Sequence, residues 1–157
     1  MTDIKIVRGL SGSGKSTLAN KIAGVNHRFS FDDAYASESI VIDRSAGQTA
    51  SRTIEMYRRI RNVALGRPAL IVLDGCFIKL EHVKRLLQSL SGIEHLRFSV
   101  HTPNTHWADD PFTCAEKSQH NIPVPVIIRQ QQNFEVFNSD KVMSLWTDLW
   151  LERVGVV

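Results

Sequence analysis

Cysteine, long hydrophobic runs and a leader-like start are scarce or missing in this sequence of 157 residues. The two cysteines, Cys76 and Cys114, are too few for a disulfide-stabilised scaffold, and both are expected to be reduced thiols. The longest uninterrupted apolar run, residues 69–73, is far shorter than the roughly 20 residues of a membrane-spanning helix. Residues 1–5 lack the basic start and the apolar stretch of a secretory signal. These absences disfavour the secreted and membrane classes, and we expect a cytoplasmic protein with no membrane partner.

The residues that are present fit one folded domain. The sequence is 43% hydrophobic and 22% charged, a balance that allows a soluble domain to bury a core. No repeat, low-complexity tract or linker divides it. We therefore expect residues 1–157 to form a single domain.

Arginine is concentrated in one segment. Residues 44–67 contain six arginines and one acid, Glu55, so that the segment carries +5 although the whole chain carries only +3. Arginine binds phosphate through its planar fork of N–H donors. The helical pattern of this segment places four arginines on its polar half, Arg52, Arg58, Arg59 and Arg61, and we predict that this face binds a nucleic-acid substrate, DNA rather than RNA. An ordinary solvated helix face is the alternative.

The hydrophobic pattern alternates between short strands and amphipathic helices. Strands are expected at residues 4–7, 28–31, 69–73 and 95–100. Helices are expected at residues 16–23, 49–65, 80–90, 125–134 and 141–153. This alternation predicts an α/β fold with a parallel sheet of four or five strands and helices on both faces. Ligands of such sheets bind beyond the carboxyl ends of the strands, so the residues that follow the strands should gather in one site.

A glycine-rich segment carries the clearest motif. Residues 9–17 read GLSGSGKST, fit the pattern G-x-x-x-x-G-K-[ST], and lie between an expected strand and an expected helix. Such a loop points backbone N–H groups at phosphate oxygens, while Lys15 reaches the β- and γ-phosphates and Ser16 ligates Mg²⁺. We predict that ATP and Mg²⁺ bind here, through Gly9, Ser11, Gly12, Ser13, Gly14, Lys15, Ser16 and Thr17.

The phosphate loop alone leaves the reaction open, because GTPases, ATPase motors and small kinases share it. The chain is short for a motor, and it lacks the N-K-x-D signature of a GTPase. A small phosphotransferase is the favoured class. A nucleotide-binding regulator with little or no ATP turnover is the alternative from another class.

Acidic residues follow the second and third expected strands. A kinase needs a carboxylate that orients the acceptor hydroxyl and takes its proton. We predict that Asp32 is this base and that Asp33 supports the acceptor side or caps a helix, with the reverse assignment open. Asp74 follows an apolar strand, as in a Walker B element, and would hold Mg²⁺ through water or contact the acceptor. A simple strand-ending turn is the other interpretation of Asp74.

Residues 103–125 form a polar stretch that is expected to act as a lid. Lys117 lies in it and is the candidate for the basic side chain that small kinases close over the transferring phosphoryl group, although its position also fits a solvated lysine. Trp107 either stacks on a base or packs the lid. The spacing of the histidines and of Cys114 in this region matches no common zinc site.

Together these motifs resemble the small P-loop kinases of the polynucleotide kinase type, such as the 5′-kinase domain of bacteriophage T4 polynucleotide kinase and related phage DNA kinases. The resemblance rests on residues 9–17, 31–33, 72–75, 101–103 and 114–123. It implies the P-loop NTPase fold with a helical lid. Lys15 and Ser16 would hold the triphosphate and its metal, and Asp32 would be the general base. Asp74 would lie on the acceptor side, and Lys117 would stand where the family has its lid arginine.

The departures from that family lie mainly on the acceptor side. Gly75-Cys76 stands where relatives usually have Asn-Thr or Thr-Asn, and no basic residue follows the Asp pair closely. We therefore expect an ATP-dependent kinase whose acceptor hydroxyl is carried by a nucleic acid. The acceptor is either a polynucleotide 5′-hydroxyl or the hydroxymethyl group of a modified pyrimidine, such as hydroxymethyluracil in phage DNA, with the host cytoplasm as the location. A nucleoside, nucleotide or other small-metabolite kinase is the alternative.

Overall fold

A computed structural model describes residues 1–24, 27–32 and 46–155, the side chains of 46–49 excepted. The strands are β1 (Thr2–Arg8), β2 (His27–Ser30), β3 (Leu70–Gly75) and β4 (Leu96–His101). The helices are α1 (Lys15–Ala23), α3 (Ala46–Leu65), α4 (Leu80–Ser89), α5 (Pro111–Lys117), α6 (Val124–Asn133) and α7 (Ser139–Arg153). None of the described helices is long and apolar enough to cross a membrane.

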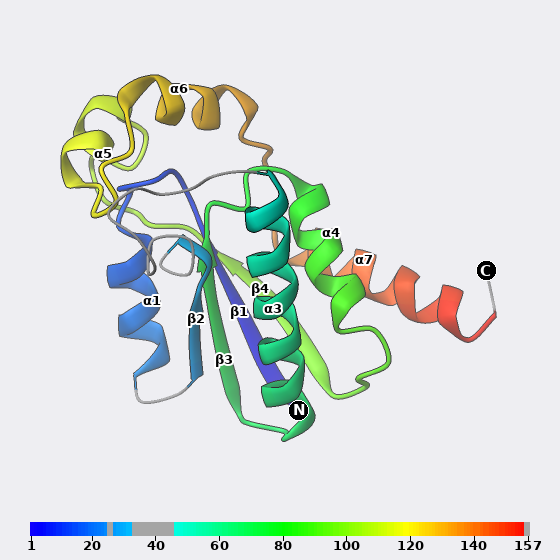
Figure 1. The fold of residues 1–157 in the computed structure, drawn as a ribbon. Helices are drawn as coiled ribbons and strands as arrows, with labels where there is room; N and C mark the ends of the chain where they lie inside the picture. The colour runs from blue at the N-terminus through cyan, green and yellow to red at the C-terminus, as the bar shows by residue number, and fades with distance from the viewer. Residues whose placement is uncertain (25–26, 33–45, 156–157) are drawn as a thin grey trace.

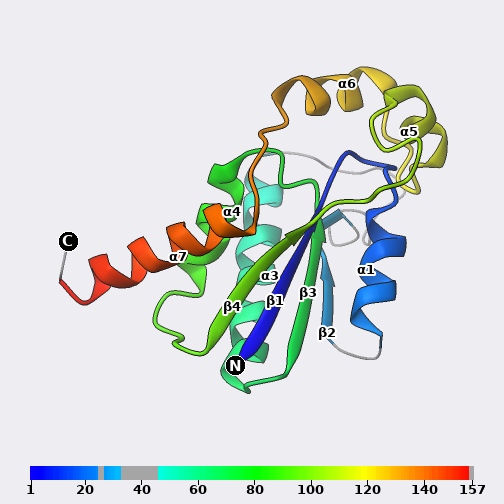
Figure 2. The same ribbon diagram turned by 180° about the vertical axis from the view of Figure 1, so that it is seen from behind.

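The strands form one parallel sheet in the order β2-β3-β1-β4. Helices cover both of its faces, as Figures 1 and 2 show from opposite sides: α1 lies on one face, and α3, α4 and α7 lie on the other. The predicted α/β fold with a parallel sheet and helices on both faces is confirmed.

The apolar runs of the strands follow from burial on two faces. Successive side chains of a strand point to opposite faces, so both alternate sets must be apolar when both faces are covered. In β3, Ile71 and Leu73 belong to the large core under α3, α4 and α7, whereas Val72 packs with Ala19 and Ala23 of α1. This explains why residues 69–73 show no polar alternation.

The register aligns the carboxyl ends of the strands at one edge. Val7 of β1 pairs with Asp74 on one side and with His101 on the other, and Ser30 of β2 also pairs with Asp74. β1 continues into the phosphate loop, and β2 continues into Asp32. The sheet therefore gathers the predicted site residues, as expected for the carboxyl edge of a parallel sheet.

The helices α5 and α6 form a lobe over this edge of the sheet (Figures 1 and 2). Cys114 of α5 is fully buried and packs with Leu10, Ile122 and Ile127 in a small core of their own. The polar stretch 103–125 contains α5 and belongs to this lobe, and its action as a lid stays a prediction.

The base of this lobe is fixed to β1 by a buried arginine. The Arg8 guanidinium lies between the rings of Phe134 and Phe137, 3.9 and 3.8 Å from their centroids, and donates to the carbonyls of Phe77 and Ile78. Burial lowers the pKa of Arg8 to about 10, so it stays charged at neutral pH. Arg8 therefore ties the end of β1 to the chain between α6 and α7.

Candidate active site

The phosphate loop turns sharply from β1 into α1. Gly12 and Gly14 have φ angles of 78° and 105°, a left-handed conformation that glycine adopts without Cβ strain. Gly14 immediately precedes α1, whose first turn contains no acidic residue. Ser13 Oγ is buried and has no hydrogen-bond partner among the residues the structure describes. The loop therefore offers unpaired donors at a helix N-terminus, which is the arrangement that binds phosphate.

Lys15 is the buried cation of the site. Its side chain is 4% exposed, and its Nζ donates to the Leu10 carbonyl at 2.9 Å and lies 3.3 Å from Asp32 Oδ2. Burial opposes the charge of Lys15, but Cys76, Asp32 and Asp74 outweigh it, so that its pKa is raised. Lys15 is therefore charged at neutral pH, with Asp32 as the counter-charge that a phosphate would replace.

Asp32 stands between this lysine and solvent. Its side chain is 28% exposed, so an acceptor can reach the carboxylate. Phe31 anchors the segment, since its ring contacts Phe77 at 5.3 Å and Tyr57 at 6.0 Å between centroids in edge-to-face geometry. The structure thus brings the predicted base and the predicted phosphate-binding lysine together. Asp33 lies outside the described residues.

Cys76 is a site residue that sequence reasoning noticed only as a departure from a family. Its Sγ lies 3.5 Å from Ser11 Oγ, 3.8 Å from Lys15 Nζ and 3.9 Å from Asp32 Oδ1. Burial raises the pKa of the Cys76 thiol, so it is protonated at neutral pH and is a weak donor to its neighbours. The feature of the sequence that could have indicated a site residue is the position of Cys76 directly after β3.

Asp74 is fully buried at the end of β3. Arg28 Nε donates to Asp74 Oδ2 at 2.8 Å and holds the side chain in an ion pair. Burial raises the pKa of Asp74, against the opposing effect of Arg28. Asp74 Oδ1 has no hydrogen-bond partner in the described part of the chain. This oxygen and the partly exposed Ser16 hydroxyl fit the water-mediated and direct ligands of a Mg²⁺ ion.

Gln130 of α6 reaches the phosphate loop, a contact that no sequence motif predicts. Its Oε1 accepts from the Ser11 backbone N–H, and its Nε2 donates to Ser11 Oγ, both at 3.0 Å. The carboxamide oxygen therefore occupies an N–H group of the loop in the way that a phosphate oxygen would. Gln130 lies in a run of three glutamines, which gave no signal.

Two further lid residues contact the loop backbone. Trp107 Nε1 donates to the Gly12 carbonyl at 3.0 Å, and Thr105 Oγ1 donates to the Ser13 carbonyl at 2.9 Å. A Cβ on Gly12 would lie 1.9 Å from the carbonyl oxygen of the lid residue at position 114, so the two backbones pack closely. Lys117 is exposed, and its Nζ lies 4.2 Å from the centroid of the Trp107 ring. Trp107 thus packs the lid, and the role predicted for Lys117 stays a prediction.

The arginines of α3 have different partners. Arg58 forms two hydrogen bonds with Glu55, at 2.9 and 2.6 Å, in an exposed ion pair. Arg61 donates to the carbonyls of Ser89 and Ser91 and so ties α3 to the end of α4. The guanidinium groups of Arg58 and Arg61 are therefore bonded to other groups of the protein.

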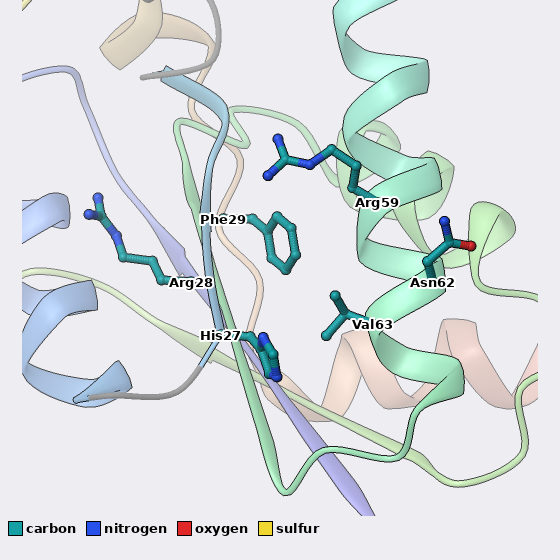
Figure 3. A pocket seen from close by; sticks show the side chains of 6 residues that line it. All are labelled: His27, Arg28, Phe29, Arg59, Asn62 and Val63. Atoms are coloured by element: carbon teal, nitrogen blue, oxygen red, sulfur yellow. The ribbon is translucent and has the colours of Figure 1, made fainter.

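Arg59 lies beside a groove between β2 and α3, which Figure 3 shows from close by. Its guanidinium carbon is 5.5 Å from the centroid of the Phe29 ring. Arg52 lies two turns earlier on the same helix and is half-buried. The groove has a volume of about 390 Å³ and is lined by His27, Arg28, Phe29, Arg59, Asn62 and Val63.

Comparison with known proteins identifies the fold. No protein-family model and no curated protein matches the sequence. A gluconokinase from Sinorhizobium meliloti 1021 is similar with a TM-score of 0.55 and 19% identity, over 98% of this chain and 93% of that chain. A chain of the Pnkp1/Rnl/Hen1 complex is similar with a TM-score of 0.53 and 16% identity, over 82% of this chain and 38% of that chain. A shikimate kinase from Acinetobacter baumannii, in complex with shikimate, gives a TM-score of 0.40 at 14% identity, over 97% and 79%. At these identities the likeness to the first two structures concerns the fold alone, and it confirms the predicted P-loop NTPase fold.

Proposed function

We propose that this protein is an ATP-dependent phosphotransferase that transfers the γ-phosphate to an alcohol hydroxyl carried by a nucleic acid. One observation carries the reaction class: the partly exposed carboxylate of Asp32 lies 3.3 Å from the phosphate-loop cation Lys15. A carboxylate so close to the terminal phosphates is within reach of a hydroxyl that attacks the γ-phosphorus. This is the place at which a kinase requires a base.

In the proposed reaction the acceptor oxygen bonds to the γ-phosphorus, and the bond from that phosphorus to the β–γ bridging oxygen breaks. The acceptor proton passes to the Asp32 carboxylate, and ADP leaves with the electron pair of the broken bond. Lys15 turns its charge from Asp32 to the phosphate oxygens, and the N–H groups of the loop bind the phosphates. Mg²⁺, held by Ser16 and through water by Asp74, would neutralise part of the phosphate charge.

The nucleic-acid acceptor is supported by the order and spacing of the motifs, which resemble those of polynucleotide-type kinases, and by the cationic groove at Arg59 beside β2. A second candidate is a small-metabolite kinase. It is favoured by the match to a gluconokinase over almost the whole length of both chains. The two candidates share the reaction and differ only in the acceptor.

Transfer from γ-labelled ATP to a panel of acceptors tests the proposal. The panel contains a 5′-hydroxyl oligonucleotide, DNA with hydroxymethylated pyrimidines, free nucleosides and gluconate. We expect label on one of the two nucleic acids. Label on nucleosides or gluconate alone would replace the first candidate with the second. Bound ATP with no label on any acceptor would favour the regulator and contradict both.

A further inference from the structure

The groove between β2 and α3 is an open cationic hollow beside the site. β2 is the outermost strand of the sheet, and within the described residues no other strand pairs with its outer edge. Among the six described residues that line the groove none is acidic, and Arg59 is the one whose guanidinium lies on its α3 side. A volume of about 390 Å³ lies within the range of small-ligand pockets, about 300–1,000 Å³. The groove therefore suits an anionic group of nucleotide size.

Arg59 is held over the groove with its donors available. The Phe29 side chain is only 8% exposed and belongs to the core, so its ring is a fixed platform for the guanidinium. In the part of the chain that the structure describes, Arg59 makes no hydrogen bond or salt bridge. Its five N–H donors can therefore bind phosphate.

The neighbouring basic side chains differ from Arg59 because their guanidinium groups already have hydrogen-bond or ion-pair partners. Arg58 is paired with Glu55, and Arg61 is bonded to two backbone carbonyls. Figure 3 shows that the Arg28 side chain points away from the groove, toward the opposite side of β2, where it pairs with Asp74. Of Arg28, Arg58, Arg59 and Arg61, Arg59 is thus the one whose guanidinium faces the groove.

The groove also lies next to the place of transfer. β2 ends at Ser30, one residue beyond Phe29, and Phe31 and Asp32 follow it in a helical turn. An acceptor chain with its terminal hydroxyl at Asp32 can therefore extend along β2 into the groove. A free nucleoside is too short to occupy both places.

From these observations we infer that the groove binds a phosphodiester of a single-stranded polynucleotide whose reacting hydroxyl lies at Asp32. Arg59 binds the phosphate, while His27 and Asn62 offer hydrogen bonds to the sugar or the base next to it. The inference rests on the proposed function and adds a second contact for its acceptor.

The test compares Arg59→Ala with Arg85→Ala, a control that removes an exposed arginine of α4 that pairs with Glu81. Binding of labelled 5′-hydroxyl single strands, one arm DNA and one arm RNA, is measured without ATP at several salt concentrations. We expect R59A to weaken binding of at least one arm about tenfold and to reduce the slope of log K against log salt by about one. R85A should stay within about twofold, and R59K should recover part of the loss because it keeps the charge without the fork.

Transfer assays separate this inference from the proposed function. In R59A, we expect a higher KM for a long oligonucleotide and an unchanged KM for a nucleoside. Equal effects of R59A and R85A on binding would overturn the groove site, even if oligonucleotides are phosphorylated. Binding that depends on Arg59, without any phosphorylation of the bound strand, would instead support the groove site and contradict the proposed reaction. Circular dichroism of each variant shows that the fold is retained.

Discussion

The phosphate loop and the acceptor edge of the site hold their polar groups in different ways. The loop is held by neutral hydrogen bonds from the lid, through Gln130, Trp107 and Thr105. The acceptor edge is held by two ion pairs, Lys15 with Asp32 and Arg28 with Asp74. A phosphate oxygen can replace the Gln130 oxygen on the Ser11 N–H, whereas Trp107 and Thr105 donate to loop carbonyls and can stay in place. At the acceptor edge, removing one member of a buried ion pair leaves the other charge without its partner.

The largest effect is expected where the two regions meet, at Lys15. Lys15→Ala removes the cation of the loop and the partner of Asp32, so we expect transfer to fall about a thousandfold and ATP binding to weaken, as for other losses of transition-state charge stabilisation. Label transfer and ATP titration measure the two effects. Lys21→Ala, an exposed lysine on the same helix, is the control and should behave as wild type. Equal activity of the two variants would show that Lys15 does not serve the reaction.

The second-largest effect is expected from the buried ion pair of the acceptor edge, Arg28 with Asp74. It should appear in the free energy of unfolding. Arg28→Ala leaves the Asp74 carboxylate buried without its partner, at a cost of about 2 kcal/mol in the free energy of unfolding, because Arg28 itself is partly exposed. The double variant R28A/D74N removes the charge as well and should recover part of the loss. Urea unfolding of the two variants measures this coupling, and additive losses would contradict the pairing.

The stability of Arg28→Ala should also depend on pH, in a direction that follows from the pKa of Asp74. Burial already raises the pKa of Asp74, and losing Arg28 raises it further. A carboxyl with a higher pKa in the folded than in the unfolded protein favours folding in acid and loses that contribution as the pH rises through the folded pKa. The stability of R28A relative to wild type should therefore decrease from acidic to neutral pH. A deficit that grows toward acid would contradict the buried position of Asp74.

A smaller effect is expected on the loop side, from Gln130. Its carboxamide oxygen takes the Ser11 N–H that a phosphate oxygen would use, so Gln130→Ala should tighten ATP binding, by about fivefold if one neutral hydrogen bond is at stake. Gln132→Ala, an exposed neighbour in the same glutamine run, is the control. Isothermal titration with ATP measures both. Weaker binding by Q130A would show that Gln130 assists bound ATP rather than competing with it.

The smallest effect is expected from Lys117. Its ammonium group lies over the Trp107 ring and is exposed, so Lys117→Ala should lower kcat only a few-fold if this contact persists. A loss of a hundredfold or more would show that the lysine moves to the transferring phosphoryl group, as its position in the lid predicts. Single-turnover transfer distinguishes the two outcomes.

The sequence predicted what is local in the chain. The loop from Gly9 to Thr17 is a contiguous motif, and Lys15 follows from it. Asp32 and Asp74 were found because parallel strands place their carboxyl ends together, so that two acids distant in the sequence become neighbours. The strands and helices expected from the hydrophobic pattern occur near their expected positions, and α5 carries a start signal in Asp110 and Pro111 that the pattern alone did not use.

What could not be predicted depends on contacts between distant segments. Cys76 and Gln130 reach the loop from β3 and α6, and neither belongs to a motif. Arg28 pairs with Asp74 because the register of β2 and β3 places them close together. The arginines of α3 show the same limit: their positions follow from the helical period, whereas the partners of Arg58 and Arg59 depend on the folded chain.

The central claim is that Lys15 and Asp32 form a phosphotransfer site, and Asp32→Asn tests it most directly. This variant keeps the shape of the side chain but removes the base. Label transfer from ATP to the acceptor that wild type uses is measured alongside ATP binding. We expect transfer to fall by about a hundredfold or more while ATP binding is retained. Transfer at the wild-type rate by D32N would contradict the account.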